Sequence, residues 1–327
     1  MQAIVQDEYG TAEVLELEEV ALPVVGDDQV LIQVHAAAVN PYDWHMMTGK
    51  PYLVRALAGL RRPKQRIPGA DVSGRVEAVG AEVTEFLPGD EVFGSARGAY
   101  AEYAVAKENR IVKKPDTVSF EQAASVAIAG LTALQGLRDK GQIQPAHEVL
   151  VIGASGGVGT FAVQIAKSYG ARVTGVCSTR NLDMVRSIGA DHVLDYTEDD
   201  FTEPGRQYDL ILDVVGSHSL RQCRRTLTHG GIYVSAGMEK KGNWIQPLTH
   251  VLKVKLASLM GRQKMFSILS SITKPDLVAM RELMESGEVA PVIDRCFDLA
   301  EASDALRHQG EGHARGKTVI KMQRETP

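Results

Sequence analysis

Short valine-rich runs separated by turn residues dominate the first third of the chain. They lie at residues 29–38, 72–79, 91–93 and 100–105. Gly-Asp, Pro-Gly and Gly-Ala pairs interrupt the runs, and this arrangement is typical of β-strands. The pattern predicts a compact, mostly β domain up to about residue 114. A short strand at 316–321, after a helix near 300–307, is expected to return to this domain.

From Ser119 onward the pattern changes to helices that alternate with apolar strands. Ser119 and Gln122 have capping-box spacing, in which two residues cap a helix N-terminus reciprocally. Helical patterns at 181–188 and 220–227 lie between apolar runs. The predicted strands are residues 148–152, 172–177, 192–194, 210–214 and 231–235. This alternation predicts an α/β fold with a doubly wound parallel sheet.

Two domains suit these patterns and the length of 327 residues. We expect residues 1–118 and 292–327 to form the mostly β domain, with substrate and catalytic groups. Residues 119–291 are expected to form the domain with the parallel sheet. Residues 264–271 are predicted as an edge strand, where such sheets pair with a second subunit, so a homodimer is expected.

Composition indicates a globular protein, since 44% of residues are hydrophobic and 24% are charged. The net charge of −5 gives no overall attraction to nucleic acid or to an anionic membrane. Cations between residues 240 and 264 are interleaved with apolar residues. A nucleic-acid patch is one interpretation of them, but a solvated face or a phosphate-flanking loop suits an acidic protein better.

Cysteine content and hydropathy limit the cellular compartments in which the protein is expected. The three cysteines, Cys177, Cys223 and Cys296, are odd in number and far apart, which argues against a disulfide framework and favours a reducing compartment. The N-terminus lacks the features of a signal peptide, and no run of about 18 apolar residues is present to span a bilayer. We therefore expect a cytoplasmic protein without a membrane span.

The most informative motif is an apolar run, residues 149–152, that breaks into a glycine-rich turn and then a helical pattern. The turn is Ala154-Ser155-Gly156-Gly157-Val158-Gly159. In a dinucleotide-binding unit, Gly156 would let the backbone approach a pyrophosphate, and Gly159 would let the helix pack closely on its strand. The helix N-terminus then faces the anion. These six residues are therefore predicted to bind a nucleotide cofactor.

Cofactor choice depends on the end of the second strand of this unit. A NAD-preferring unit carries an acidic residue there, about 20 positions after the glycines. This chain has Cys-Ser-Thr-Arg at 177–180 and no acid before Asp183. Ser178 can donate a hydrogen bond to a phosphate, and the Arg180 guanidinium matches one. The sequence therefore predicts NADP(H), with a plain surface role for Arg180 as the alternative.

Other residues are expected around the cofactor because they follow strands of the sheet. Tyr196, after the third strand, is predicted as a phosphate or ribose contact, with ordinary packing as the alternative. Gly216 and Gly237 follow the fourth and fifth strands, where parallel sheets bind ligands, and are predicted to line the nicotinamide half of the site. Lys317 is expected to reach it from the C-terminal strand.

Eight motifs in order, covering nearly the whole chain, resemble the zinc-independent quinone oxidoreductases of the medium-chain dehydrogenase/reductase superfamily. They are residues 1–5 with 9–10, then 39–44, 68–74, 88–92, 130–133, 154–159, 189–191 and 312–317. The chain resembles most the branch that contains chloroplast-envelope quinone oxidoreductase homologues and alkenal or enone reductases. The resemblance implies a GroES-like β domain and a Rossmann domain, with the cofactor in the cleft between them.

The resemblance also implies roles for individual residues. Asn40 is expected beside the nicotinamide ribose, and Thr132 is expected to contact the cofactor unless it is structural. Asp43 is expected to fix the Asn40 loop, with a turn-capping carboxylate as the alternative. Tyr52 is the candidate proton donor to the acceptor oxygen, with water as the alternative. The basic segment 55–66 is either a lid that selects an acyl or anionic substrate or a solvated loop.

Zinc-dependent members of the superfamily use a Cys-x-x-Asp segment and a Gly-His-Glu turn, which suit tetrahedral zinc. The matching positions here hold Asn40 and Ala70, and three cysteines cannot build a four-cysteine structural site. The sequence therefore predicts no metal.

Without a Lewis acid the acceptor must be electrophilic by itself, as quinones and α,β-unsaturated carbonyls are. We therefore expect an NADPH-dependent oxidoreductase that acts on such small molecules and not on nucleic acid. A zinc-type alcohol dehydrogenase and a non-catalytic NADPH-binding or sensor protein are the alternatives.

Overall fold

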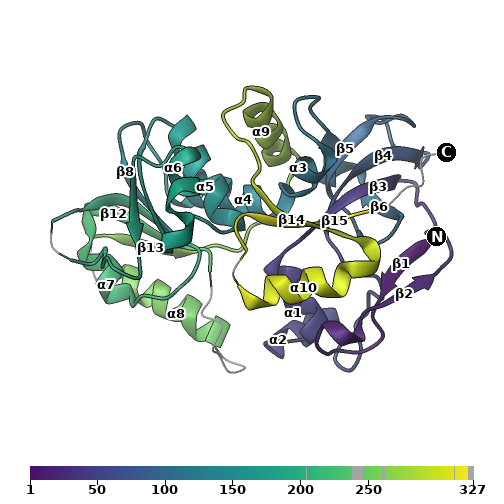
Figure 1. Ribbon diagram of the computed structural model, residues 1–327, viewed down its shortest axis with the longest axis horizontal. Coiled ribbons are helices and arrows are strands. Elements are labelled where there is room, and N and C mark those ends of the chain that lie inside the picture. Colours follow the sequence, from purple (N-terminus) through teal and green to yellow (C-terminus); the bar gives the residue numbers. More distant parts are fainter. Residues whose placement is uncertain (204, 238–245, 260–261, 313, 323–327) are drawn as a thin grey trace. The chain divides into compact units, whose positions relative to one another are not determined.

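The chain divides into two compact units (Figure 1). The computed structural model describes residues 1–203, 205–237, 246–259, 262–312 and 314–322. Unit 1 comprises Met1–Ile128 and Ile272–Pro327, and unit 2 comprises Ala129–Ser271. Helix α4 (Ala127–Gln135) begins in unit 1 and continues into unit 2.

A largely antiparallel sheet forms the frame of unit 1. Its strands run in the order β14-β15-β3-β4-β5-β7, with β6 paired on β3. Their bounds are β3 (Gln29–Val39), β4 (Asp71–Val79), β5 (Glu91–Ser95), β6 (Tyr103–Lys107), β7 (Ile111–Lys113), β14 (Ile293–Asp298) and β15 (Lys317–Lys321). Separately, β1 (Gln2–Val5) pairs with β2 (Glu16–Glu19). Because β15 pairs antiparallel with β3, the C-terminal strand does return to this unit.

Strand β3 is apolar from Ala36 to Val39 because both of its faces are covered there. Ala36 and Ala38 pack in a cluster with Ala124 of α3 (Phe120–Ala124). Ala37 and Val39 join the main core of unit 1 on the other face. Small side chains at these positions allow a helix and a core to approach one strand from both sides.

Among the described residues, four further α-helices belong to unit 1, and one of them contains part of the basic segment 55–66. Their bounds are α1 (Pro41–Thr48), α2 (Leu53–Ala58), α9 (Lys274–Glu285) and α10 (Ala302–Glu311). Helix α1 packs on both α2 and α10. The expected helix near 300–307 corresponds to α10, and the basic segment 55–66 contains part of α2 rather than a simple loop.

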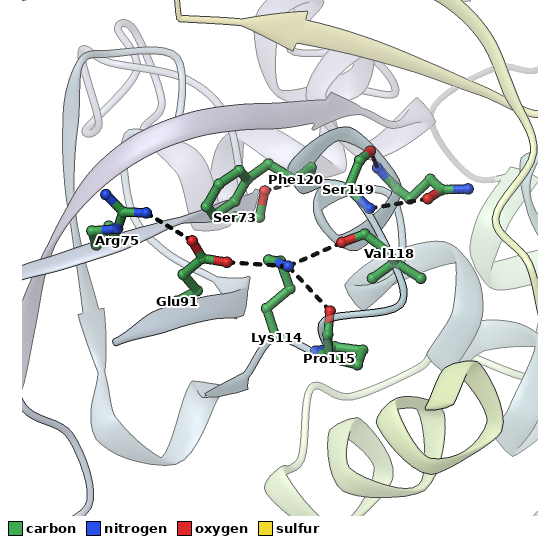
Figure 2. Close-up of polar contacts among 9 residues, drawn as sticks. Ser73, Arg75, Glu91, Lys114, Pro115, Val118, Ser119 and Phe120 are labelled. Carbon is green, nitrogen blue, oxygen red and sulfur yellow. Dashed lines mark hydrogen bonds and ion pairs between the residues drawn. The ribbon is translucent and has the colours of Figure 1, made fainter. Parts of the chain in front are cut away.

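Unit 1 extends beyond the predicted boundary at residue 118 because buried polar contacts tie α3 to its strands. Figure 2 shows the largely buried Lys114 side chain, whose Nζ contacts Glu91 at 3.2 Å and the Val118 carbonyl at 2.9 Å. The Ser73 hydroxyl donates to the Phe120 carbonyl. At the other joint α9, which was expected in the sheet domain, packs on β7.

Ser119 and Gln122 form the predicted capping box at the start of α3. The Ser119 N–H donates to Gln122 Oε1 at 3.0 Å, and the Gln122 N–H donates to Ser119 Oγ at 3.2 Å. Figure 2 shows both bonds.

Unit 2 contains the predicted doubly wound sheet, in which all strands are parallel. Their order is β10-β9-β8-β11-β12-β13. The bounds are β8 (Glu148–Ile152), β9 (Arg172–Cys177), β10 (His192–Asp195), β11 (Tyr208–Asp213), β12 (Leu227–Ser235) and β13 (Lys264–Ser267). Strand β13 lies at the edge, as expected, but is shorter than predicted. The mixed fold, a GroES-like domain with a Rossmann domain, is thus confirmed.

Helices lie on both faces of this sheet. Figure 1 shows α5 (Gly157–Ser168) and α6 (Leu182–Ser187) on one side, with α7 (Leu220–Arg225) and α8 (Gln246–Leu259) on the other. No helix in the described part of the chain is long and apolar enough to cross a membrane.

Candidate active site

The glycine-rich turn of unit 2 lies at the carboxyl end of β8, where the strand order reverses between β9 and β11. Parallel sheets bind ligands at such a point. The N–H groups of Gly153 and Ala154 donate to the Val176 carbonyl at 3.1 and 3.0 Å, which fixes the turn against β9. Gly153 has a φ of 86°, a left-handed conformation that favours glycine.

Gly156 and Gly159 have different physical reasons for being glycine. A Cβ on Gly159 would lie 2.0 Å from the Gly153 carbonyl oxygen, so close packing of α5 on the turn requires glycine there. A Cβ on Gly156 would meet only that same oxygen, at an ordinary 3.5 Å. The protein itself therefore leaves room at Gly156, as expected where a ligand approaches the backbone.

Asn181, which the sequence reasoning missed, joins this turn to the end of β9. Its Nδ2 donates to Ser155 Oγ at 3.0 Å and to Ser178 Oγ at 3.1 Å. The side chain is buried, and its Oδ1 has no hydrogen-bond partner among the described residues. A buried acceptor of this kind is stabilised by a donor, which water or a bound group can supply. Asparagine after a strand is ordinarily read as a turn residue, so its sequence position carried no signal.

The residues predicted to select the phosphate lie at the adjacent carboxyl ends of β9 and β10. Arg180 is exposed in the turn Thr179–Asn181 that follows β9. The Tyr196 N–H donates to the Cys177 carbonyl at 3.1 Å, and its side chain is 61% exposed. The structure therefore brings Tyr196 beside the end of the strand that Ser178 and Arg180 follow.

Asp213, a second residue missed in the sequence, shapes the loop after β11. Its buried Oδ1 accepts the N–H groups of Val215 and Gly216 at 2.9 and 2.8 Å, and Oδ2 accepts the Tyr233 hydroxyl at 2.9 Å. A Cβ on Gly237 would lie 2.4 Å from the backbone of Val214. The two predicted glycines thus lie where the ends of β11 and β12 approach closely. In the sequence, the signal for this role was the position of Asp213 within an apolar run.

Thr132 lies on α4 and is largely buried. Its hydroxyl shares a 2.7 Å hydrogen bond with the hydroxyl of Ser270. Gln135, one turn further along α4, exchanges hydrogen bonds of 2.7 and 3.1 Å with the backbone of Ser271. Thr132 therefore has a structural partner, and its predicted cofactor contact stays a prediction.

In unit 1, Asn40 is the centre of a buried polar cluster at the start of α1. Its Oδ1 accepts a 2.5 Å hydrogen bond from Lys317 Nζ, and its Nδ2 donates to Asp71 Oδ2 at 3.0 Å. The amide can point only one way, because a flipped amide would turn its NH2 toward an ammonium and its oxygen toward a carboxylate. The three side chains are each at most 3% exposed.

Asp71, which lies in the motif 68–74 and had no predicted role, connects this cluster to α4. Both of its carboxylate oxygens accept the Ile128 N–H, at 3.1 and 3.2 Å. Burial raises the pKa of Asp71 to about 6, and the Lys317 charge and the Asn40 hydrogen bond limit that rise. Burial lowers the pKa of Lys317, while the charges of Asp71 and Asp43 oppose that change.

Lys317 itself is directed inward. Besides Asn40, its Nζ contacts the Val39 carbonyl at 3.1 Å. The partners that the structure gives it lie in unit 1, and its expected reach to the cofactor stays a prediction.

Asp43 lies beneath the same loop and is buried. Its Oδ2 accepts the Asn40 N–H at 2.8 Å, which is the turn-capping role considered for it. Burial and the nearby charge of Asp71 raise the pKa of Asp43 to about 7. Burial, and then the Asp43 charge, raise the pKa of Tyr100 well above its usual value. The carboxyl group thus fixes the Asn40 backbone and has a protonation equilibrium near neutral pH.

The donor set around Asn40 does not suit zinc. An amide and the methyl group of Ala70 occupy the positions that match zinc ligands of the zinc-dependent members, and an ammonium group lies 2.5 Å from the amide oxygen. A dication at this place would meet the charge of Lys317. No group of three or more His, Cys, Asp or Glu side chains that could hold a metal was found in the described ranges.

Tyr52 lies at the N-terminus of α2 and is 37% exposed. The Arg55 guanidinium lies 4.6 Å from the centre of the Tyr52 ring and 4.5 Å from that of Tyr9. Such cation–π contacts hold an aromatic ring in place. The Tyr9 hydroxyl donates to the Gly59 carbonyl at 2.6 Å, which anchors the other side of this stack.

Two family models match the chain. Residues 26–116 match an alcohol dehydrogenase GroES-like domain, and residues 188–320 match a zinc-binding dehydrogenase. The chain is 34% identical to a mitochondrial NAD(P)H oxidoreductase of Mus musculus, over 98% of this chain and 89% of the relative. It is also 34% identical to a chloroplastic quinone oxidoreductase of Triphysaria versicolor, with 98% of each chain covered. Since these relatives are named as organellar, the cytoplasmic location stays a prediction.

Solved structures agree with these relatives. The quinone oxidoreductase of Coxiella burnetii superposes with a TM-score of 0.87 at 32% identity, covering 99% of both chains. The Escherichia coli quinone oxidoreductase complexed with NADPH shares the fold, with a TM-score of 0.81 at 23% identity over 98% of this chain and 100% of that one. The chain therefore belongs to the quinone oxidoreductase branch of the medium-chain dehydrogenase/reductase superfamily.

Proposed function

We propose that this protein is an NADPH-dependent reductase that transfers hydride to quinones or α,β-unsaturated carbonyls without a metal. The observation that carries the proposal is the Lys317–Asn40–Asp71 chain of hydrogen bonds. It fills the place of zinc ligands with groups that are already paired with one another. Relatives named as NAD(P)H or quinone oxidoreductases support the reaction class.

The cofactor would bind at the carboxyl edge of the unit 2 sheet. The N-terminus of α5 and the space at Gly156 suit a pyrophosphate. Ser178, Arg180 and Tyr196 suit the adenosine ribose and its 2′-phosphate, and the loop at Gly216 and Gly237 suits the nicotinamide half. When bound, NADPH supplies the hydride.

Residues of unit 1 would orient the reaction. Asn40 would offer a neutral hydrogen-bonding group to the nicotinamide ribose, in exchange for the weak 3.4 Å bond that its Nδ2 donates to the Ala38 carbonyl. Lys317 and Asp43 would act as positioning residues, because they hold the Asn40 side chain and backbone. Tyr52 would donate a proton or hydrogen bond to the oxygen of the reduced acceptor.

The acceptor must carry its own electrophilicity, because no Lewis acid is available in this proposal. In a quinone or an enone, hydride addition places charge on a conjugated oxygen, which a single hydroxyl or water can neutralise. Unactivated ketones and alcohols lack this advantage and are expected to react poorly.

A substrate screen tests the proposal. The purified protein is mixed with NADPH or NADH and with quinones, alkenals, long-chain enones, simple ketones and alcohols, while absorbance of the reduced cofactor is followed. We expect turnover with the conjugated acceptors, undiminished by a zinc chelator. Stoichiometric zinc and oxidation of alcohols would support a zinc-type alcohol dehydrogenase instead. Tight NADPH binding without turnover of any acceptor would favour a sensor protein.

A homodimer paired through β13 remains part of the proposal. The strand pairs with β12 on one side and lies at the end of the strand order. Its outer edge is therefore suited to pairing with the same edge of a second copy. Light scattering after size-exclusion chromatography gives the mass that decides it.

A further inference from the structure

Charge is distributed very unevenly along this acidic chain. Residues 240–275 contain seven lysines and arginines and no aspartate or glutamate, although the whole chain has a formal net charge of −5. Lys240 and Lys241 lie outside the described residues, whereas the cations of α8 and β13 are within them. The segment is therefore rich in cations, although Lys274 at its end belongs to unit 1 and pairs with Glu85 at 2.6 Å.

Helix α8 carries two exposed leucines in the middle of this segment. Leu252 and Leu256 are 56% and 51% exposed and lie four residues apart, on one face of the helix. Val254, on the other side, is 1% exposed and packs in the unit 2 core with Met265 and Tyr233. The helix is thus anchored by one face and presents an apolar stripe on the opposite face.

Lysines flank this stripe on both sides. At about 100° per residue, Lys255 lies about 60° to one side of Leu252 and Lys253 about 100° to the other. Both lysines are exposed. An apolar stripe with a cation on each side is the pattern of a helix that lies in a membrane interface, where lysine stems extend to the headgroups.

We propose that α8 docks this protein, through Leu252, Leu256 and the flanking lysines, onto an anionic lipid surface. The lysines attract anionic headgroups, and residues 240–275 contain no aspartate or glutamate that would repel them. Binding would be peripheral and reversible, because two leucines insert little apolar area and the attraction between charges is screened by salt.

Two other occupants fit less well. Symmetric pairing of this stripe with a second copy would place Lys253 and Lys255 against the same lysines, which repel. A nucleic acid would meet the cations but gives no reason for exposed leucines between them.

Sedimentation with vesicles tests the proposal on the full chain. Vesicles of phosphatidylcholine alone are compared with vesicles that also contain phosphatidylglycerol, at low and high salt. We expect binding only to the anionic vesicles, and its loss at high salt. Leu252→Ser with Leu256→Ser and, separately, Lys253→Glu with Lys255→Glu should each weaken it by roughly tenfold or more.

Matched variants in unit 1 serve as controls. Leu22→Ser with Leu87→Ser changes two leucines that are 56% and 70% exposed, and Lys107→Glu with Lys113→Glu makes the same change in net charge. Both should bind as the wild type does, and circular dichroism should report a folded chain for all four variants.

Three results would overturn the proposal. The first is failure of the wild type to sediment with anionic vesicles, and the second is equal weakening by the unit 1 controls. The third is a loss of dimer mass in the α8 variants, which would assign the stripe to a second copy. If the first result is found, binding to a single-stranded polynucleotide that survives the leucine changes would assign the lysines to nucleic acid.

Discussion

Lys317 Nζ donates a 2.5 Å hydrogen bond to Asn40 Oδ1, and both side chains are buried in unit 1. Lys317 lies near the C-terminus and Asn40 near the N-terminus, and antiparallel pairing of β15 with β3 brings them together. The bond fixes the direction of the Asn40 amide. It also places a positive charge where zinc-dependent relatives in the superfamily are expected to have a metal.

Replacing this lysine should destabilise the protein strongly. Lys317→Met removes the cation that compensates Asp71, and breaking a buried charge pair typically costs about 3–5 kcal/mol. Lys321→Met, on the same strand but partly exposed, should change the free energy of unfolding by less than about 0.5 kcal/mol. Urea unfolding of both variants measures the difference. Equal effects would mean that the buried ammonium contributes nothing specific.

Asp43 should make stability depend on pH. Its pKa is about 7 in the folded protein and 3.8 in the unfolded chain, so the folded state binds the extra proton between these values. The associated stability is complete below pH 3.8 and is lost as the pH rises through 7. The Asp43→Asn side chain cannot lose a proton. As the pH rises, the free energy of unfolding of the wild type should therefore fall relative to that of this variant by up to about 4 kcal/mol. Urea unfolding between about pH 4 and pH 8 measures this change. A difference between wild type and variant that stays constant with pH would mean that the pKa of Asp43 is not raised.

The two glycines of the turn should respond differently to the same added methyl group. Gly159→Ala places a Cβ against the Gly153 carbonyl oxygen and should cost about 1–3 kcal/mol or more of folding stability. Gly156→Ala meets no such obstacle, so it should leave unfolding almost unchanged but weaken NADPH binding. Thermal unfolding and fluorescence titration with NADPH measure the two effects. A normal NADPH affinity in Gly156→Ala would contradict a close approach of the cofactor there.

Cofactor preference should depend on Arg180. A charge-assisted hydrogen bond contributes about 2 kcal/mol, so Arg180→Ala should raise the Kd for NADPH by roughly thirtyfold and affect NADH little. Arg172→Ala, an exposed cation at the opposite end of β9, is the matched control. Isothermal titration with both cofactors measures the two Kd values. If Arg180→Ala weakened the binding of NADPH and NADH equally, Arg180 would not bind the 2′-phosphate.

The Tyr52 hydroxyl should matter for turnover and not for folding. Tyr52→Phe keeps the ring that stacks on Arg55, so thermal stability should stay unchanged. Loss of a proton donor should lower kcat with enones by roughly tenfold or more, with little change in the KM for NADPH. Tyr169→Phe, at the end of α5, controls for removal of a hydroxyl elsewhere. An unchanged kcat would assign the proton to water.

The sequence by itself determined most strands of both units, several helices and the glycine-rich turn. Valine-rich runs and alternating strands and helices reflect local burial, so they could be recognised without a structure, as could the cap at Ser119 and the close-packed Gly159. These features depend on residues near one another in the chain. Their physical causes, hydrophobic burial and backbone geometry, leave a local pattern in the sequence.

Only the tertiary structure decided which polar side chains meet. Asn181 reads as a turn residue in the sequence. Asp71 and Lys317 are separated by most of the chain, so no sequence spacing predicts that both contact Asn40. The same is true of the unit boundary, where buried Lys114 ties α3 to the first unit. Pairing between distant strands creates these neighbours, and with them the burial that raises the pKa values of Asp43 and Asp71.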